Sequence, residues 1–592
     1  MSASAPPPRH GQPARRRAAV LAAGITTTLT VGLGIAYTQT TDSAAGIGMA
    51  ATTTTTATST TAQTAAAAST STGCTAKLTP GKTWPDRYNS TVTITGAGTW
   101  TAVITMTAPQ KVSTVWNGTA SWGGGSGDIM TVKSNGSGKT FGFTTQYNGN
   151  TTAQPKITSC TATTSTSTTS PTTTQKPATT TTTPAAAADL TVKTGTKYQT
   201  IDGFGSAVSI WGSAWSAAET QTLFGTGAQQ LGQSIVRTGI SPVPSEWANQ
   251  VSALKSAEAS GSNVKILATP WTAPAAWKTN NSRINGGKLK TEYYDDYANH
   301  LNDYVSYMKS RGVSIDVVSI QNEPDWHPDY DAMDWSATEL KNFVRDQGAK
   351  IKNTQLMVAE SLNMDDSLTD PLLKDATARN NIGYIGGHLY GAEDAGHLKA
   401  YGLADQYQKP VWMTEWNYHK AASDTSTAWS QPGNQAVWDE TLDDVMRTVH
   451  KSMEANWSAY IWWYGKRYYS FIGDGNAGTT TGAPLKRGYA FSQYAKYVRP
   501  GDQRVAVSQS SKASALEVTA YQGSGKIKLV ILNRSTKAIS NAVIQAPQTV
   551  SKAEDYLTSR TANAASQTAG INGQQVTVDV PARSISTVIL SQ

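Results

Sequence analysis

The feature that most constrains the fold is a series of eight apolar, β-rich segments between residues 201 and 464, with helical stretches between them. Two of these stretches, Glu292–Lys309 and Ser336–Lys352, carry apolar residues at helical spacing. Eight strands alternating with helices over about 265 residues predict a (β/α)8 barrel, the TIM barrel, in residues 189–500. The expected strands are Ile201–Gly205, Ser234–Ile240, Lys265–Trp271, Ile315–Gln321, Gln355–Ser361, Ile382–Tyr390, Pro410–Trp416 and Ser458–Tyr464.

The pattern changes after the barrel. Beyond Gly501 the helical spacing stops, and short alternating runs such as ALEVTAY, KIKLVILN and QVTVDV follow. These runs predict a C-terminal β-sandwich in residues 501–592, fused to the barrel and joined by a strand at residues 189–200. We expect this side domain to stabilise the barrel by burying one face of a sheet.

The N-terminal residues predict export. Arg9 and Arg15–Arg17 precede a long apolar run, Ala18–Tyr37, which small residues follow. This order is typical of a signal peptide, here residues 1–45, and an uncleaved membrane anchor is the alternative. A secreted, extracellular protein is therefore expected. Two low-complexity segments follow, a Thr/Ala-rich one at 46–73 and a Thr/Pro linker at 161–188.

Residues 74–160 alternate apolar and polar side chains between Gly, Asn and Pro turns, which predicts a small all-β sandwich separate from the barrel. The chain has two cysteines, Cys74 and Cys160, and they bracket this segment. In a secreted chain this spacing predicts one disulfide, and two free thiols are the alternative. Trp100 lies in an alternating strand and is expected in the core. Trp84 and Trp116 are flanked by turn residues, which favours positions facing solvent.

Charge and aromatic content narrow the class of partner. The net charge of +8 arises within the first 188 residues, so the barrel region is close to neutral and has no basic stripe for nucleic acid. The chain has 18 Trp and 24 Tyr but 7 Phe. Trp and Tyr offer flat apolar faces with a polar edge, which suits the binding of sugar rings at a wet surface.

Two glutamates follow strands of the expected barrel. The fourth strand leads into QNEPDW, which contains Glu323, and the seventh into MTEW, which contains Glu415. Catalytic groups of this fold lie at the carboxyl ends of strands, so these two carboxyl groups are expected to face each other. Hydrolysis of a glycosidic bond needs such a pair, one protonated and one ionised. A surface ion pair is the alternative for either residue alone.

The barrel resembles glycoside hydrolase family 30 through QTIDGFGSA, QLGQSIVRTGI, ILATPWTAP, SIQNEPDW, IGGHLYG, KPVWMTEW and AYIWWYGKRYY, in this order. The resemblance implies that Glu323 is the acid/base and Glu415 the nucleophile of a retaining double displacement. It implies that Asn322 binds the 2-hydroxyl of the reacting sugar. It also implies stacking of sugar on four aromatic residues, namely Trp271, Trp463, Trp211 and Tyr390. His388 either hydrogen-bonds near Glu415 or fills the barrel.

The run AYIWWYGKRYY is similar to subfamily 8, the glucuronoxylan endo-xylanases. The resemblance implies that Arg467 and Tyr469 bind the carboxylate of a (methyl)glucuronic acid branch on xylan. A guanidinium can bind a carboxylate through two parallel hydrogen bonds. An ion pair at the barrel rim is the alternative for Arg467. The residues around Arg467 and the loop Ala422–Ser426 depart from the subfamily pattern.

Residues 74–160 resemble carbohydrate-binding module family 2, with the bracketing cysteines and the runs VWNG and FGF followed by YNG. The resemblance places Trp84 and Trp116 on a face that binds cellulose or xylan. The third surface tryptophan of the family is missing from VKSNGSGKTFGF, and Trp122 is the candidate to replace it.

The expected protein is thus a secreted, monomeric, retaining endo-β-1,4-xylanase acting on glucuronoxylan. Two alternatives keep the family: an endo-β-1,6-glucanase or galactanase, and a xylanase independent of glucuronate, including one that releases xylobiose. A third is a polysaccharide-binding scaffold with an inactive barrel. No cofactor is expected, and no metal site, because the sequence has no HExxH, Cys/His cluster or acidic calcium loop.

Overall fold

The computed structural model describes residues 69–71, 74–96, 99–123, 129–134, 139–163, 186–208, 214–261, 263–391 and 396–592. The described residues form two compact units, 69–163 and 186–592. The expected signal peptide and nearly all of the expected linker lie outside the described residues. No helix in the described ranges is long and apolar enough to cross a membrane.

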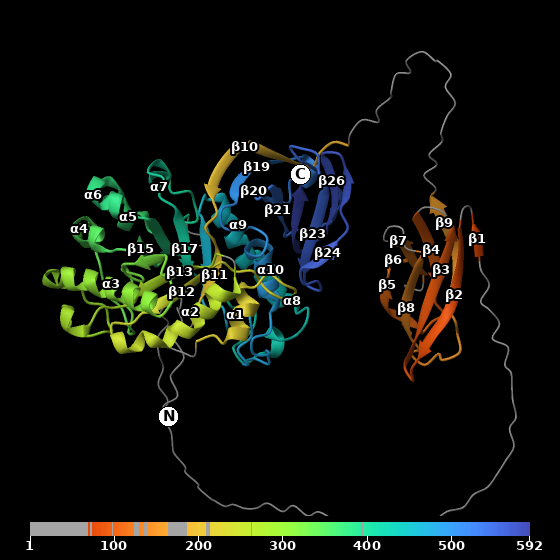
Figure 1. Ribbon diagram of the computed structural model, residues 1–592, viewed down its shortest axis with the longest axis horizontal. Helices are drawn as coiled ribbons and strands as arrows, with labels where there is room; N and C mark the ends of the chain where they lie inside the picture. Colours follow the sequence, from red (N-terminus) through yellow and green to blue (C-terminus); the bar gives the residue numbers. More distant parts are fainter. Residues whose placement is uncertain are drawn as a thin grey trace, which may run out of the picture. The chain divides into compact units, whose positions relative to one another are not determined.

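The larger unit contains a closed barrel of eight parallel strands in chain order, which confirms the predicted (β/α)8 barrel (Figure 1). Each strand is at or within two or three residues of its expected position, because runs of buried apolar residues are a strong strand signal. The strands are β11 (Gly203–Ala207), β12 (Ile235–Ile240), β13 (Lys265–Pro270), β14 (Val317–Ser319), β15 (Gln355–Ser361), β16 (Tyr384–His388), β17 (Val411–Glu415) and β18 (Ala459–Trp462).

Helices follow the barrel strands. Ser336 caps α4 in a capping box with Glu339, as its position before an amphipathic run predicts. The helix ends at Gln347 and not at the expected Lys352, because a short 3-10 turn starting at Gly348 replaces its last turn. The helices are α1 (Ala217–Phe224), α2 (Ala248–Ser260), α3 (Tyr294–Ser310), α4 (Ala337–Gln347), α5 (Asp366–Lys374), α6 (Ala376–Asn381), α7 (Gly402–Gln406), α8 (Gln435–Glu440), α9 (Arg447–Glu454) and α10 (Lys486–Ala495).

The amino end of the barrel is filled by side chains. Trp412 is fully buried among apolar residues from neighbouring strands. Its indole Nε1 donates a hydrogen bond of 3.0 Å to Asp202, which also pairs with Lys265. Trp462 of β18 is fully buried and packs against Trp416 and Phe471. With this end filled, a substrate site is left to the carboxyl ends of the strands.

The C-terminal region is all-β and packs on the barrel. Ten strands are hydrogen-bonded to one another in a single order, and an apolar core lies between two groups of these strands. β10 joins the two groups, because it pairs with β19 on one side and with β22 on the other. On the barrel side, buried Gln493 of α10 bonds Thr558 and Thr587. The strands are β10 (Leu190–Thr200), β19 (Gln503–Gln509), β20 (Glu517–Gly523), β21 (Lys526–Asn533), β22 (Ile539–Gln545), β23 (Lys552–Ser559), β24 (Ala565–Gln567), β25 (Gly570–Asn572), β26 (Gln575–Val580) and β27 (Ser584–Ser591).

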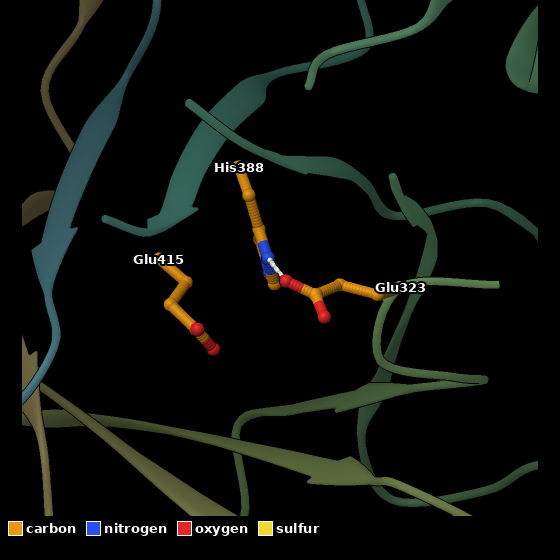
Figure 2. Close-up of side chains that lie close together, drawn as sticks. All are labelled: Glu323, His388 and Glu415. Carbon is orange, nitrogen blue, oxygen red and sulfur yellow. Dashed lines mark hydrogen bonds and ion pairs between the residues drawn. The ribbon is translucent and has the colours of Figure 1, made fainter. Parts of the chain in front are cut away.

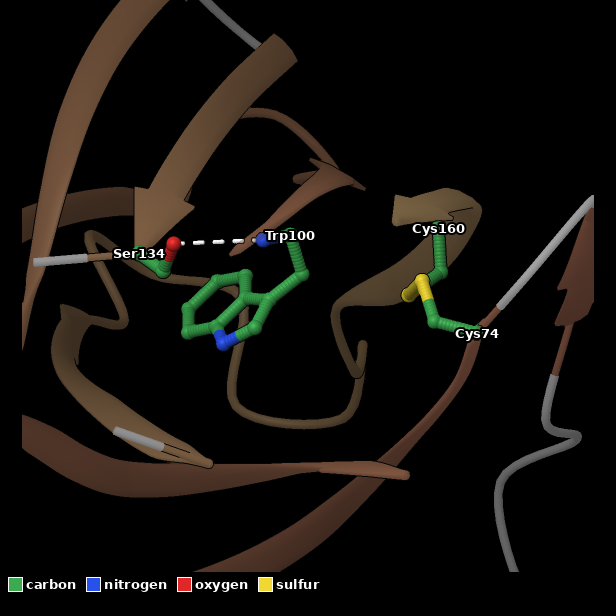
Figure 3. Close-up of a disulfide and its surroundings, with 4 residues drawn as sticks. All are labelled: Cys74, Trp100, Ser134 and Cys160. Carbon is green, nitrogen blue, oxygen red and sulfur yellow. Dashed lines mark hydrogen bonds between the residues drawn. A yellow bond between two sulfur atoms is a disulfide. The ribbon is translucent and has the colours of Figure 1, made fainter. Parts of the chain in front are cut away.

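Residues 69–163 form two antiparallel sheets over a shared apolar core. Cys74 and Cys160 are joined in a disulfide beside buried Trp100, whose backbone N–H donates to Ser134 (Figure 3). The first sheet contains β1 (Ser69–Ser71), β2 (Cys74–Thr83), β3 (Arg87–Gly96), β8 (Thr140–Gln146) and β5 (Lys111–Trp116). The second contains β6 (Gly118–Gly123), β7 (Ile129–Ser134), β4 (Thr99–Thr105) and β9 (Lys156–Thr163).

The tryptophans expected on the surface of this unit differ in exposure. Trp84 and Trp116 are half-buried and belong to the first sheet and its β2–β3 turn. The Trp116 indole packs against Gly142. A Cβ atom at position 142 would lie 2.3 Å from the indole and would clash with it. Trp122 is 48% exposed but stands on β6 of the second sheet. It is therefore not a third member of the sheet that carries Trp116, contrary to its expected role as a replacement.

Candidate active site

Glu323 and Glu415 meet at the carboxyl end of the barrel, as their positions after strands predict (Figure 2). Glu415 is the last residue of β17, and Glu323 follows β14. They are 4% and 3% exposed. One carboxylate oxygen of each, together with a ring nitrogen of His388, forms a group whose atoms all lie within 4.8 Å of one another. These three residue types can also hold a metal ion, but Glu415 is already paired with a guanidinium.

Both oxygens of Glu415 accept hydrogen bonds. Arg237 of β12 donates from Nη1 to Oε2 at 2.6 Å, and the Tyr390 hydroxyl donates to Oε1 at 2.9 Å. Asn417 donates in turn to the Tyr390 hydroxyl at 3.0 Å. Tyr390 thus directs its hydroxyl at Glu415. The carboxylate has a counter-charge and a fixed orientation, which an attacking oxygen requires.

Glu323 has different partners. His388, the last residue of β16, lies with Nδ1 2.9 Å from Glu323 Oε1. His388 thus lies near Glu415, as one of its two expected roles has it, and its direct hydrogen bond is to Glu323. The side-chain amide oxygen of Asn322, Oδ1, accepts a hydrogen bond from Arg237 Nη2 at 2.7 Å. This bond fixes the amide so that its NH₂ group is the end left to donate to a ligand.

Two charged residues of the site escape the sequence analysis. Arg237 and Glu360 are fully buried on β12 and β15, and Arg237 Nη2 lies 3.1 Å from Glu360 Oε1. The signal that could have found them is a charge inside an apolar strand, IVRTGI and LMVAES. A buried charge needs a partner, so each of these residues predicts the presence of the other.

The charges of the site act on one another. Burial by itself lowers the pKa of His388, but the carboxylates of Glu415, Glu323 and Glu360 outweigh it and raise that pKa to about 9. Burial by itself raises the pKa of Glu360, but Arg237 and His388 outweigh it and hold that pKa at about 2. At neutral pH His388 is therefore protonated and donates to Glu323, while Glu360 is ionised.

Aromatic residues surround the carboxylates. Trp271 follows β13 and Trp463 follows β18, and their ring centroids lie 5.8 Å apart. The Arg237 guanidinium lies 4.8 Å from the Trp271 ring centroid. Tyr464 and Tyr330, which the sequence analysis also missed, join the same cluster. Trp211 lies outside the described residues. Trp271 and Trp463 are 5% and 8% exposed, and Tyr390 is half-buried.

Arg467 and Tyr469 lie on the loop after β18. Arg467 is half-buried, with its guanidinium carbon 5.3 Å from the ring centroid of Tyr464, which stacks on Trp463 at 3.8 Å. Tyr469 is 8% exposed and stacks on His419 at 3.9 Å with nearly parallel rings. Arg467 thus stands beside the aromatic cluster of the site.

A buried ion pair organises the two loops that carry these residues. Arg487 and Glu440 lie 2.6 Å apart, N to O. Arg487 also donates to the carbonyls of Tyr418 and Tyr469 at 2.7 Å each. Glu440 accepts from the backbone N–H of Ala421 at 2.6 Å. The ion pair of Arg487 and Glu440 therefore connects the loop after β17 to the loop after β18.

Comparison with known proteins agrees with this geometry. Residues 244–462 match the model of the glycosyl hydrolase family 30 TIM-barrel domain. The chain is 32% identical over 413 residues to glucuronoxylanase XynC of Bacillus subtilis (strain 168), covering 69% of this chain and 93% of that one.

Solved structures give the same result. The glycoside hydrolase family 30 subfamily 8 xylanase Xyn30A from Clostridium acetobutylicum superposes with a TM-score of 0.59 and 29% identity, covering 68% of this chain and all of that one. A family 30 endoxylanase from Clostridium papyrosolvens C71 gives 0.58 and 30%, with the same coverage.

Proposed function

This chain belongs to glycosyl hydrolase family 30 and is a glycoside hydrolase, and we propose that it is a secreted, retaining endo-β-1,4-xylanase that cuts glucuronoxylan. The observation that carries the proposal is the buried pair Glu323 and Glu415, with oxygens less than 5 Å apart. Retaining enzymes hold their carboxyl groups about 5–5.5 Å apart, whereas inverting enzymes need about 6.5–9.5 Å to admit a water molecule.

The proposed reaction has two steps. Glu415 attacks the anomeric carbon while Glu323 gives its proton to the departing glycosidic oxygen, leaving a covalent xylosyl ester on Glu415. Glu323 then takes a proton from a water molecule, whose oxygen attacks the same carbon and releases Glu415. Arg237 and Tyr390 orient Glu415, and the Asn322 amide donates to the 2-hydroxyl of the reacting sugar.

The substrate assignment is supported by the similarity to glucuronoxylanase XynC and by Arg467 beside the aromatic cluster. We assign to Arg467 and Tyr469 the binding of the branch carboxylate. Stacking of xylose units is assigned to Trp271, Trp463, Trp211 and Tyr390. The surface of residues 74–160 that carries Trp84 and Trp116 is assigned to cellulose or xylan, and Trp122 to a separate position on the other sheet.

The test is a digest of glucuronoxylan, arabinoxylan and β-1,6-galactan, with products sized by mass spectrometry. We expect each glucuronoxylan product to carry one glucuronate, and arabinoxylan to be almost untouched. Xylobiose or unbranched products from both xylans would contradict the branch requirement. Release from galactan with xylans intact would contradict the xylanase assignment.

The Arg467→Ala variant tests the branch contact. Loss of a charge-assisted hydrogen bond of about 1.5–3 kcal/mol predicts a fall of about 10–100-fold in kcat/KM on glucuronoxylan. Lys466→Ala is the matched control, because this neighbouring cation is paired with Glu219 at 2.6 Å. An equal effect of both substitutions, or none from Arg467→Ala, would contradict the assignment.

A further inference from the structure

A third carboxylate, Glu360, lies behind the catalytic pair. It is fully buried and touches groups that contact each catalytic glutamate. On one side, Arg237 Nη2 lies 3.1 Å from its Oε1, and the same guanidinium donates to Glu415. On the other side, His388 Nε2 lies 3.8 Å from Oε1, while His388 Nδ1 contacts Glu323.

The backbone is shaped to aim this side chain inward. The pairing of β15 with β16 shifts register between Ala359 and Ser361, and Ala359 and Glu360 have φ angles of 77° and 38°. Left-handed backbone at a residue other than glycine costs about 1–3 kcal/mol and persists where the surroundings enforce it. A bulge in a strand re-aims a side chain. Two such residues in succession therefore indicate that the surrounding structure enforces the position of the Glu360 side chain.

The neighbouring strands accommodate the carboxylate. The Thr269 hydroxyl of β13 donates to Glu360 Oε2 at 2.9 Å. Gly386 of β16 leaves space for it, since a side chain there would lie 2.7 Å from Glu360 Cγ. The backbone N–H of Glu323 donates to the Glu360 carbonyl at 3.0 Å, which ties the acid/base to the same bulge.

From these contacts we propose that Glu360 is a positioning residue of the reaction, which holds Arg237 against the nucleophile Glu415 and His388 against the acid/base Glu323. This inference rests on the proposed function, because it takes Glu415 and Glu323 as the reacting pair. Glu360 itself exchanges no proton and forms no bond with substrate. Its negative charge balances the positive charges of Arg237 and His388. Without it, these two buried cations would lie unbalanced beside Glu323 and Glu415, whose charges change during the reaction.

The proposal predicts a change in pH dependence. The titratable groups that face His388 are Glu323, Glu360, Glu415, Asp325 and Tyr390, and the carboxylates of the three glutamates raise its pKa. Removing the charge of Glu360 lowers that pKa, so His388 loses its proton nearer neutrality. A charge 3–4 Å away shifts a pKa by about one unit or more. The alkaline limb of the kcat profile then moves to lower pH by a similar amount.

The experiment compares Glu360→Gln, Glu360→Asp and the wild type on soluble glucuronoxylan. We expect Glu360→Gln to lower kcat by about 100-fold with little change in KM, because the reacting groups lose their alignment. We expect Glu360→Asp to keep the alkaline limb at the wild-type position, since it retains the charge. Thermal unfolding of each variant is measured in parallel.

Asp502→Asn is the matched control, because Asp502 forms a buried ion pair with Lys528 in the C-terminal region. Its loss should lower the unfolding temperature without moving the pH profile. A Glu360→Gln variant that loses only stability, as the control does, overturns the proposal. If Glu360→Gln does not fold, Thr269→Val takes its place, with a several-fold loss of kcat expected and an unchanged kcat overturning the proposal.

Wild type and Glu415→Gln are run in the same assay to separate the two levels of inference. An inactive wild type would contradict the proposed function itself. An active wild type, an inactive Glu415→Gln and an unaffected Glu360→Gln would leave the function standing and overturn the role of Glu360.

Discussion

At the scale of single residues, the two catalytic glutamates differ in what holds them. Glu415 accepts hydrogen bonds from Arg237 and Tyr390, whereas Glu323 lies against His388. Arg237 places a positive charge against Glu415, and His388 orients Glu323 through its Oε1 atom. The environment thus separates two chemically identical side chains.

Alanine substitutions should separate the same two roles. Glu415→Ala should lose at least about 1,000-fold in kcat on every substrate. Glu323→Ala should cleave an aryl glycoside of glucuronate-branched xylobiose with a good leaving group in a fast first step, because that leaving group needs no proton. Added azide should restore turnover to both variants with opposite anomers of the azide product, which NMR distinguishes. Restoration with the same anomer in both would contradict the assigned roles.

The sequence could predict the reacting pair but not the network that holds it. Glu323 and Glu415 follow buried strands within recognisable runs, and these features are visible in one dimension. Arg237 and Glu360 are 123 residues apart, and each alone looks like an interruption of an apolar strand. Their pairing depends on two strands that bond to different neighbours in the barrel. The partner of His388 depended likewise on the exact direction of side chains in space.

At the scale of elements, the barrel strands were easier to predict than the end of a helix or a short strand at the edge of a sheet. The barrel strands are apolar on both faces and contrast with the amphipathic helices around them. β1, which is Ser69–Ser71, falls in the expected low-complexity segment because a strand of Ser and Thr has no apolar alternation. The end of α4 was placed too late because Gly348 is a mild helix breaker in sequence.

One buried carboxyl group of the C-terminal region lowers the folding stability to an extent that depends on pH. Asp555 of β23 is 1% exposed, and neither of its carboxyl oxygens has a hydrogen-bond partner among the described residues. Burial, and then the charge of Asp579, raise the pKa of Asp555 to about 7. The unfolded chain ionises near the ordinary value, so folding stability falls as the pH rises from about 4 to about 7.

Asp555→Asn should remove this dependence. We expect the variant to be more stable than the wild type at pH 8, by up to about 4 kcal/mol. The difference should shrink below pH 4, where Asp555 is protonated in both states. Urea unfolding at several pH values measures it. Parallel curves of stability against pH for the two proteins would contradict the account.

At the scale of the whole molecule, the disulfide belongs to one unit alone. Cys74 and Cys160 close a loop of 86 residues within residues 69–163, and residues 186–592 contain no cysteine. Closing a loop of this length contributes about 4.6 kcal/mol on the chain-entropy model. A reductant should therefore destabilise residues 69–163 and leave the stability of residues 186–592 unchanged.

Calorimetry with and without a reductant tests this independence. Reduction, or the double substitution of Cys74 and Cys160 by Ser, should lower the unfolding temperature of residues 69–163 and leave that of residues 186–592 unchanged. Hydrolysis of a soluble xylan should be unaffected. A parallel fall of both transitions, or a loss of activity on reduction, would show that the two units depend on each other.

In the proposed reaction Glu415 attacks the sugar and forms a covalent intermediate. Mass spectrometry of the intact protein and of its peptides tests this after reaction with a 2-deoxy-2-fluoro xylobioside that bears a good leaving group and carries a glucuronic acid branch on its second xylose. We expect one 2-deoxy-2-fluoro xylobiosyl group per chain, attached to Glu415 with loss of the leaving group and absent from Glu323. An active enzyme that forms no adduct, or an adduct on another residue, would contradict it.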